Sequence, residues 1–564
     1  MNARLLFAAA VAAVSLTGCA ARVSPPIAAP TSVVDVQILA LNDFHGNVER
    51  PPDPVRFQLG TDTFATAEAG GAAIVGQELT NLRSGHTYTI TVAAGDLIGA
   101  SPLTSAYFLD EPTIDAMNLM GLSISSVGNH EFDKGSAELL RMQKGGCAKY
   151  TTRLPCRLER FRGAQFEYLA ANVQKADGTT IFPPTAIRQF GPIRIGFIGM
   201  TLKDTATLVT PAGVAGLRFA DEAATANALV PRLRAQGADA IVLLIHQGGR
   251  VPSSYHLQDC DGLSGDILPL LDKLDPAIAT VISGHTHNAY ACELDRGGAK
   301  RLLTSAGKYG YFVSDLRLAF DPGTHRLLAQ HARNVPMIRD GVGNPAIAAL
   351  VKRYADAAAP AAARVVGRLS APAPRAESDA ESPAANLIAD AQLAATRAAD
   401  RGGAQISFIN VSGVRAGLTP NARGEVTYGS IFAMQPFGNN LVVKTLTGAQ
   451  LKTLLEQQFK LENGAAKVSS LLVPSAGFRF SYDLKQPEGR RITAMTLDGR
   501  PIDPNGRYRI VVNNFLASGG DGFSVLNEGT DAFDAGLDLD ALEAWLATNP
   551  PVPPVGRITS ASSP

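Results

Sequence analysis

The 564-residue chain has no excess of charge of either sign: 51 Lys and Arg residues balance 51 Asp and Glu residues, leaving a formal net charge of zero. Proteins that bind nucleic acid or membrane surfaces usually carry a basic excess, so we expect no polymeric nucleic acid as a partner. The chain is too long for one ordinary hydrophobic core, and its 46% of hydrophobic residues suffice for more than one. We therefore expect two large domains with connecting segments.

The apolar stretch near the N-terminus is too short to span a membrane comfortably. It runs for 12 residues, LLFAAAVAAVSL, between the basic Arg4 and the sequence LTGC, which ends at Cys19. LTGC resembles a bacterial lipobox, in which the cysteine carries a lipid, and predicts a lipoprotein signal peptide over 1–19 and a Pro-rich tether over 20–33. An ordinary signal peptide with a chance cysteine is the alternative. Both predict export, and the lipobox adds a lipid anchor in a bacterial membrane, facing the periplasm or the cell surface.

Cysteine is scarce, with five residues in the chain. Without Cys19 four remain, and an even number in an exported protein predicts two disulfides. Three pairings are possible, and proximity in sequence favours Cys147 with Cys156 and Cys260 with Cys292. A thiolate metal site is the competing interpretation. It is disfavoured because neither pair has the C-x-x-C spacing.

Composition and apolar runs divide the rest of the chain. Short apolar runs bounded by turn residues recur over 34–342, which predicts buried strands of an α/β domain, although periodicity alone does not exclude short core helices. Residues 343–367 are mostly helix formers and predict a linker helix broken near its end by Pro360. A second domain follows over 368–558, and 559–564 form a tail.

Five apolar runs of the first domain each end in residues that bind metals. Because the carboxyl ends of parallel strands meet at one rim of a sheet, we expect these side chains to lie together. One histidine at a strand end is more often a hydrogen-bonded turn residue, but five of the nine histidines fall in these turns. Seven ligands are too many for one tetrahedral ion and suit two ions that share a bridge, which is chemistry for phosphoester hydrolysis. The seven are Asp43, His45, Asp96, Asn129, His246, His285 and His287.

The ordered motifs NDFHG, GDLIGASP, GNHEFD, HQGG and GHTH resemble the metallophosphoesterase domain of the 5'-nucleotidase family, which includes periplasmic UDP-sugar hydrolases. The resemblance implies a four-layer α/β/β/α sandwich, followed by a linker helix and a C-terminal α/β substrate-binding domain. It also implies two divalent metal ions, of zinc, manganese, magnesium or cobalt. One would be held by Asp43, His45 and His287, the other by Asn129, His246 and His285, with Asp96 as the bridge.

The second domain carries weaker motifs of the same resemblance. They imply a phenylalanine pair that stacks on the base, an acid that takes the ribose hydroxyls, and further polar contacts to the nucleotide. For an isolated phenylalanine, core packing is the alternative. Ser412 stands where the family often has glycine, and one arginine is matched only loosely. The implied contacts are Phe437 and Phe515, Asp521, Asn410, Arg415 and the loosely matched Arg375.

These residues lead to a functional hypothesis. His130, oriented by Asp133, is expected to stabilise or protonate the leaving group, the alternative being that this pair only braces its turn. We expect an exported 5'-nucleotidase that uses a two-metal-activated hydroxide on nucleoside 5'-phosphates, with di- and triphosphates or UDP-sugars as further candidate substrates. Two alternatives remain: a 2',3'-cyclic nucleotide phosphodiesterase with 3'-nucleotidase activity, and a catalytically inactive nucleotide-binding surface lipoprotein. Glu131 has no assigned role, and the sequence leaves the oligomeric state open.

Overall fold

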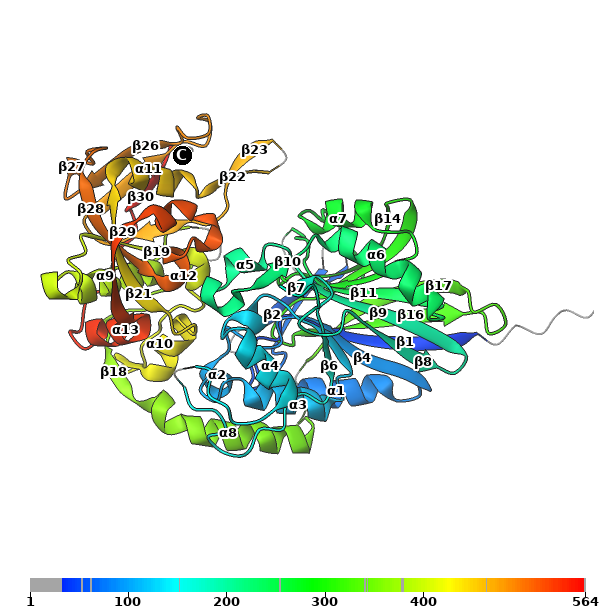
Figure 1. Ribbon diagram of the computed structural model, residues 1–564. Helices are drawn as coiled ribbons and strands as arrows, with labels where there is room; N and C mark the ends of the chain where they lie inside the picture. The colour runs from blue at the N-terminus through cyan, green and yellow to red at the C-terminus, as the bar shows by residue number, and fades with distance from the viewer. Residues whose placement is uncertain are drawn as a thin grey trace, which may run out of the picture.

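A computed structural model describes two lobes joined by the long helix α8, Pro345–Ala363 (Figure 1). It describes residues 33–561 except 52–53, 61–62, 152, 253–254, 339–340, 342, 377–379 and 463. Cys19, the predicted signal peptide and most of the predicted tether lie outside the described residues. Among the described helices, none has both the length and the apolar character that a membrane crossing requires.

The first lobe contains two six-stranded mixed sheets. In the first sheet the order is β17-β16-β1-β4-β5-β6, and β1, β4, β5 and β6 are parallel. Its strands are β1 Val34–Leu41, β4 Tyr88–Ala94, β5 Ile124–Ser126, β6 Glu167–Leu169, β16 Phe312–Phe320 and β17 Leu327–Pro336. In the second sheet the order is β14-β15-β13-β11-β9-β8, and β9, β11, β13 and β15 are parallel. Its strands are β8 Thr185–Phe190, β9 Ile193–Thr201, β11 Ala240–His246, β13 Thr280–Ser283, β14 Ala289–Arg296 and β15 Ala299–Ala306.

The two sheets face each other across a buried apolar layer. Ile38 and Val92 of the first sheet pack in one cluster with Phe197 and Val242 of the second. The outer face of the first sheet is covered by α1 Ala72–Arg83, α3 Glu111–Met120, α4 Ser136–Lys144 and α8, and the outer face of the second by α6 Glu222–Ala235 and α7 Ile267–Lys273. The predicted four-layer α/β/β/α sandwich is therefore confirmed.

Shorter elements complete the first lobe. Figure 1 shows several of them on the side that faces the second lobe. They are β2 Val55–Gly60, β3 Thr63–Ala67, β7 Val173–Lys175, β10 Leu217–Phe219, β12 Tyr255–His256, α2 Leu103–Ala106 and α5 Thr205–Leu208. The predicted disulfides are both present, Cys147–Cys156 and Cys260–Cys292.

The second lobe is built on a five-stranded sheet of order β24-β19-β28-β21-β29 and a four-stranded sheet of order β27-β26-β25-β30. The first comprises β19 Ile406–Asn410, β21 Asn440–Thr447, β24 Leu472–Pro474, β28 Arg507–Asn513 and β29 Thr530–Leu537. The second comprises β25 Phe478–Tyr482, β26 Ile492–Leu497, β27 Arg500–Pro501 and β30 Ile558–Ser560. Two hydrogen-bonded pairs are added by β18 Val365–Arg368 with β20 Glu425–Thr427, and by β22 Phe459–Glu462 with β23 Ala465–Val468. The helices are α9 Pro383–Thr396, α10 Tyr428–Met434, α11 Gly448–Glu456, α12 Asn514–Ala517 and α13 Asp538–Leu546.

The linker helix is shorter than predicted. Asn344 caps it by accepting hydrogen bonds from the backbone N–H groups of Ala346 and Ile347. The helix includes Pro360 and ends at Ala363, so the proline costs one backbone hydrogen bond without stopping the helix at that point. The prediction was wrong for 364–367, because most of these residues enter β18, which pairs with β20.

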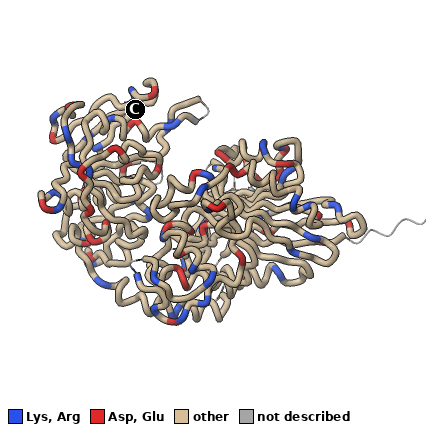
Figure 2. Tube along the Cα trace, viewed as in Figure 1, with Lys and Arg blue, Asp and Glu red and all other residues tan. Residues whose placement is uncertain are grey.

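The two lobes also meet beside the linker helix. Leu103 and Ala106 of α2 are buried in the apolar core of the second lobe. The guanidinium of Arg153 donates a hydrogen bond to the carbonyl of Ala106 at 2.7 Å and lies 5.1 Å from the ring of Phe432 in the second lobe. Figure 2 shows acidic and basic residues interspersed over both lobes, in keeping with the balanced composition.

Candidate dimetal centre and nucleotide site

The strand ends place all seven predicted metal ligands at one rim of the sandwich. Asp43 and His45 follow β1, Asp96 follows β4, and Asn129 follows β5, while His246 ends β11 and His285 and His287 follow β13. Contacts across the two sheets tie the rim together. The backbone N–H of His285 donates to Oδ2 of Asp43 at 2.9 Å, and Nδ1 of His246 lies 2.8 Å from the carbonyl oxygen of Ala94.

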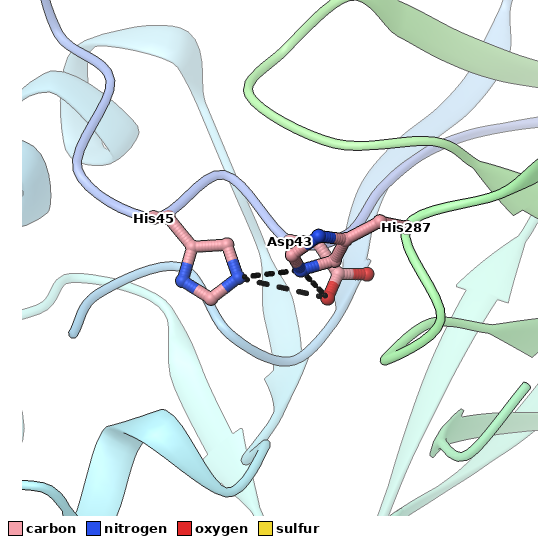
Figure 3. Close-up of side chains that lie close together, drawn as sticks. All are labelled: Asp43, His45 and His287. Atoms are coloured by element: carbon pink, nitrogen blue, oxygen red, sulfur yellow. Dashed lines mark hydrogen bonds and ion pairs between the residues drawn. The ribbon is translucent and has the colours of Figure 1, made fainter. Parts of the chain in front are cut away.

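Two groups of three possible ligands match the predicted division. Asp43, His45 and His287 form one group, and Figure 3 shows these side chains converging from two separate loops. Nε2 of His45 lies 3.0 Å from Nε2 of His287 and 3.8 Å from Oδ1 of Asp43. Asp96, His246 and His285 form the other group, and Oδ1 of Asn129 lies 3.1 Å from Nδ1 of His285.

Asp96 lies between the two groups. Its Oδ2 is 3.8 Å from Nε2 of His45 and 2.9 Å from Nε2 of His246. This is the placement expected of a bridging carboxylate. A third, overlapping group of possible ligands joins His45 and Asp96 to His130.

The backbone at this rim is strained. Five of the seven residues have left-handed φ angles, 49° at Asp43, 47° at His45, 51° at Asp96, 74° at His285 and 59° at His287. Non-glycine residues rarely adopt this conformation, and such residues cluster at functional sites. Gly128 permits the close packing, because a Cβ there would lie 2.1 Å from Oδ1 of Asp96.

The donor atoms of this rim fit divalent metal ions. Nδ1 of His246 can only donate to the carbonyl of Ala94, so neutral His246 presents a lone pair at Nε2. That Nε2 is buried, makes no hydrogen bond among the described residues, and faces the carboxylate of Asp96 at 2.9 Å. Two lone pairs this close are favourable only with a proton or a cation between them. Nδ1 of His45, 2.9 Å from the carbonyl of Gly99, turns the Nε2 of His45 inward in the same way.

The pKa values of the ligand side chains reflect burial and mutual charge. Burial raises the pKa of Asp43 and of Asp96, but the neighbouring histidines outweigh it and hold both pKa values below the ordinary one. Burial lowers the pKa of His287 to about 3 and, with the charge of His246, that of His285 to about 4, so both imidazoles are neutral near pH 7. Burial also acts to lower the pKa of His246, but the charges of Asp96 and Asp43 raise it to about 10.

His130 and Asp133 form the predicted pair beside the rim. Nδ1 of His130 lies 2.8 Å from Oδ2 of Asp133, and the backbone N–H of His130 donates to Oδ1 of Asp96 at 2.8 Å. Burial acts to lower the pKa of His130, but the charges of Asp133 and Asp96 outweigh it and raise the pKa. The imidazole therefore retains a proton more readily than a free histidine does.

Glu131 is a functional candidate that sequence reasoning left without a role. It is 2% exposed, and its two oxygens accept three backbone hydrogen bonds, from Asp96 at 2.8 Å, Leu97 at 2.8 Å and Gly128 at 2.6 Å. One carboxylate thus fastens the loop after β4 to the loop after β5. The signal in the sequence was an acid directly after the Asn-His pair, but the loop that it would hold was not deducible.

Lys308 and Tyr309 were also missed. They follow β15, which runs parallel to β13, so the same strand-end rule would have placed them at this rim. The ring of Tyr309 lies 6.0 Å from that of His45, and the ammonium of Lys308 lies 4.6 Å from the ring of Tyr309. Their motif, GKYG, contains no common metal ligand.

The second lobe contributes to the same region. The ring of Phe437 stacks on that of His130, with a centroid distance of 6.2 Å and an interplanar angle of 18°. The guanidinium of Arg415 lies 5.9 Å from the ring of Phe437, and Arg375 donates to the carbonyl of Arg415 at 3.1 Å. Asn410, from the end of β19, donates through Nδ2 to Oδ2 of Asp521 at 2.8 Å.

Phe515 lies in α12, partly buried against the core of the second lobe. Its ring covers Gly520, where a Cβ would lie 2.5 Å from a ring carbon. In the described part of the chain, ring contacts join Phe437 to His130 and not to Phe515. A base held between the two phenylalanines therefore remains a prediction.

Comparisons with known proteins agree with this arrangement. A model of calcineurin-like phosphoesterases matches residues 36–289, and a model of the 5'-nucleotidase C-terminal domain matches 365–528. The chain is 28% identical over 498 residues to the endonuclease YhcR of Bacillus subtilis, covering 87% of this chain but 38% of that protein. A probable 5'-nucleotidase of Treponema pallidum is 25% identical over 567 residues, with 88% of each chain covered.

A solved structure has the same two-lobed fold. The 5'-nucleotidase precursor from Thermus thermophilus superposes with a TM-score of 0.75 at 26% identity, over 94% of this chain and 100% of that one. Both lobes and their order along the chain are thus shared. The chain belongs to the 5'-nucleotidase family of metal-dependent phosphoesterases.

Proposed function

We propose that this protein is a 5'-nucleotidase that releases phosphate from nucleoside 5'-phosphates. The observation that carries the proposal is the contact between the lobes at His130 and Phe437. It places the candidate dimetal rim of the first lobe next to an aromatic ring and an arginine of the second. A nucleotide has the matching parts, a phosphate at one end and a flat base at the other.

The metals would be held by the residues predicted for them. Asp43, His45 and His287 suit one ion; Asn129, His246 and His285 suit the other; Asp96 suits both. When bound, two divalent ions supply an activated water and neutralise the charge of the phosphoryl group. Asn129 offers a neutral amide oxygen, which limits the negative charge that an incoming phosphate meets.

The chain's own residues then divide the remaining work. Asp133 holds Nδ1 of His130, so that the opposite edge of the imidazole, Nε2–H, is free to donate to the leaving oxygen. The raised pKa of His130 keeps that proton available near neutral pH. Arg415 contributes a guanidinium with a buried Nη2 that has no hydrogen-bond partner among the described residues, which suits an anionic ligand.

A panel of substrates tests the proposal. Purified protein loaded in turn with zinc, manganese, magnesium or cobalt would be given AMP, ATP, UDP-glucose and 2',3'-cyclic AMP, and released phosphate measured. We expect release from AMP in at least one metal form and none from the cyclic ester. Activity on the cyclic ester would instead identify the phosphodiesterase, and nucleotide binding without release in every metal form would indicate the inactive alternative. Asp96→Asn, which weakens the bridge, is the matched negative control.

We also propose that the protein is exported and lipid-anchored through Cys19. The motif LTGC supports this, as do two disulfides, which persist in oxidising compartments. Growth with a labelled fatty acid, followed by purification, should give a labelled protein, and Cys19→Ser should abolish the label. Unlabelled wild-type protein of the processed length would leave an ordinary signal peptide as the explanation.

A further inference from the structure

Asp110 is a fully buried carboxylate of the first lobe that pairs with a lysine. Its Oδ2 accepts a hydrogen bond from Nζ of Lys134 at 2.6 Å, and its Oδ1 accepts one from Oγ of Ser105 at 2.8 Å. Burial acts to raise the pKa of Asp110, but the charge of Lys134 outweighs it and holds the pKa below the ordinary value. The carboxylate is therefore charged, and loss of Lys134 would leave that charge buried without a cation.

Lys134 belongs to the turn that carries the candidate acid. It follows Asp133 directly, and Oδ2 of Asp133 lies 2.8 Å from Nδ1 of His130. The turn is compact, since the backbone N–H of Gly135 donates to the carbonyl of Phe132 at 2.8 Å. A displacement of Lys134 is thus passed to Asp133 within one residue.

The segment that ends at Asp110 packs tightly against the same turn. A Cβ at Gly99 would lie 2.7 Å from Cβ of His130 and 2.8 Å from Oδ2 of Asp133. At the other end of the segment, Leu109 and Asp110 have left-handed φ angles of 57° and 66°. Such angles cost energy in non-glycine residues and persist only where the surroundings fix them. The segment therefore holds the turn at two points, by packing at Gly99 and by the ion pair at Asp110.

Asp110 is a rigid anchor for this turn. The hydroxyls of Ser105 and Thr113 lie 2.6 Å apart, and these fully buried residues come from α2 and α3. α2 is itself embedded, because Leu103 and Ala106 lie in the core of the second lobe. Side chains that are fixed by packed elements keep the small positional tolerance that catalysis requires.

We propose that Lys134 and Asp110 are positioning residues, which hold the His130–Asp133 pair where it can protonate the leaving oxygen. This rests on the proposed function, in which His130 is the acid. In that step an oxygen from water bonds to phosphorus while the bond to the leaving oxygen breaks. The electron pair left on that oxygen takes the proton from Nε2 of His130. A weakly basic leaving oxygen departs without a proton, so a misplaced His130 should slow chiefly those esters whose leaving oxygen is strongly basic.

The test compares phenyl phosphate with 4-nitrophenyl phosphate, whose leaving oxygen is much the weaker base, on the full-length metal-loaded protein. We expect Lys134→Met to lower kcat about tenfold or more on phenyl phosphate and less than about twofold on 4-nitrophenyl phosphate, with KM and metal content unchanged. Lys134→Arg, which keeps the charge, should retain most of kcat on both esters. Lys352→Met is the matched control, because it removes the lysine of an exposed ion pair with Asp356 and should leave both rates unchanged.

The double variant of Lys134→Met with Asp110→Asn separates positioning from folding. It removes both charges, so its free energy of unfolding should return toward that of the wild type, while kcat on phenyl phosphate should stay low. Equal losses on the two esters, no release from either ester by the wild type, or recovery of kcat in the double variant would each overturn the positioning role. Release of phosphate from phenyl phosphate but from no nucleoside 5'-phosphate would overturn the proposed function and leave this inference standing.

Discussion

The carboxylate of Glu131 accepts the backbone N–H of Asp96 at 2.8 Å, and so the candidate bridging ligand is held by a buried acid that does not itself belong to the ligand set. The same carboxylate accepts the N–H of Gly128, next to Asn129. Burial, reinforced by the charge of Asp96, raises the pKa of Glu131 to about 7, while the two backbone amides act in the opposite direction. One side chain thus fixes the backbone beside two of the candidate ligands, Asp96 and Asn129.

Glu131→Ala should therefore weaken metal binding about 10- to 100-fold, the usual effect of removing a residue that orients ligands. Metal titration of the apo protein, followed through to phosphate release at saturating metal, checks this. Excess metal should restore part of the activity, because the ligands themselves remain. Glu293→Gln, an exposed position on β14, is the control. Unchanged metal affinity in folded Glu131→Ala would show that the loops hold their positions without it.

Asn129 and His130 are adjacent, but their alanine variants should lose activity for different reasons. Asn129→Ala removes a ligand oxygen and should lose metal on gel filtration, whereas His130→Ala should keep metal and lose turnover by about 100-fold or more. Elemental analysis paired with phosphate release separates the two. His130 lies within ligand reach of His45 and Asp96. Loss of metal from His130→Ala would make it a ligand and remove it from the role of acid.

Lys308 is a cation of the first lobe that lies 4.6 Å from the ring of Tyr309, next to the candidate dimetal rim. Burial lowers the pKa of Lys308, and the positive charges of Arg415 and Arg375 lower it further, so cations of both lobes gather near Tyr309. Lys308→Met should raise KM about tenfold for AMP and more for ATP, whose longer phosphate chain carries more charge. Lys352→Met, on the exposed face of α8, should leave KM unchanged. A larger effect on kcat than on KM would contradict a binding role.

Most of the first lobe followed from its apolar runs. The apolar runs of the first domain became β1, β4, β5, β9, β11, β13 and β15, because parallel strands buried on both faces are continuously apolar. The strands β8, β14, β16 and β17 do not stand out in the sequence. β17, for example, is exposed or half-buried except at Asn334 and contains no apolar run. In the second lobe, Ser382 caps α9 and Pro383 begins it, and both residue types are favoured at these positions.

The ligand set was accessible because each member ends a strand, and the parallel order of those strands is a general rule. Glu131 and Lys134 were not accessible, whereas Lys308 also follows a strand but is not a common metal ligand. Glu131 and Lys134 act on partners about 35 and 24 residues away, through contacts that only the folded chain defines. The linker helix ends before 364–367 because β18 pairs with β20. Local helix propensity carries no information about that pairing.

The two disulfides should differ in their contribution to stability. Cys147–Cys156 joins residues 9 apart in sequence and Cys260–Cys292 residues 32 apart. Loop-closure entropy then predicts stabilisation of roughly 3 and roughly 4 kcal/mol. Serine double variants of each pair, unfolded in urea, measure both values. Cys156 also donates its backbone N–H to buried Glu111, so the smaller loop retains an anchor after reduction. The loop-length argument would be contradicted if both double variants lost the same free energy of unfolding, or if the variant without Cys147–Cys156 lost more.

Asp538, at the start of α13, should make the second lobe less stable at alkaline pH. It is 2% exposed, Oδ2 lies 3.5 Å from Nε2 of Gln435, and burial raises its pKa from 3.8 to about 7. Between these two values the folded state holds a proton that the unfolded state has released, so the free energy of unfolding falls as pH rises. Asp538→Asn removes the charge. At pH 8 its free energy of unfolding should exceed that of the wild type by on the order of 1 kcal/mol or more, and at pH 5 the difference should be smaller. Thermal unfolding at both pH values measures this. The opposite result is a wild type that gains stability relative to Asp538→Asn between pH 5 and pH 8. It would mean that the buried carboxylate is stabilised as an anion.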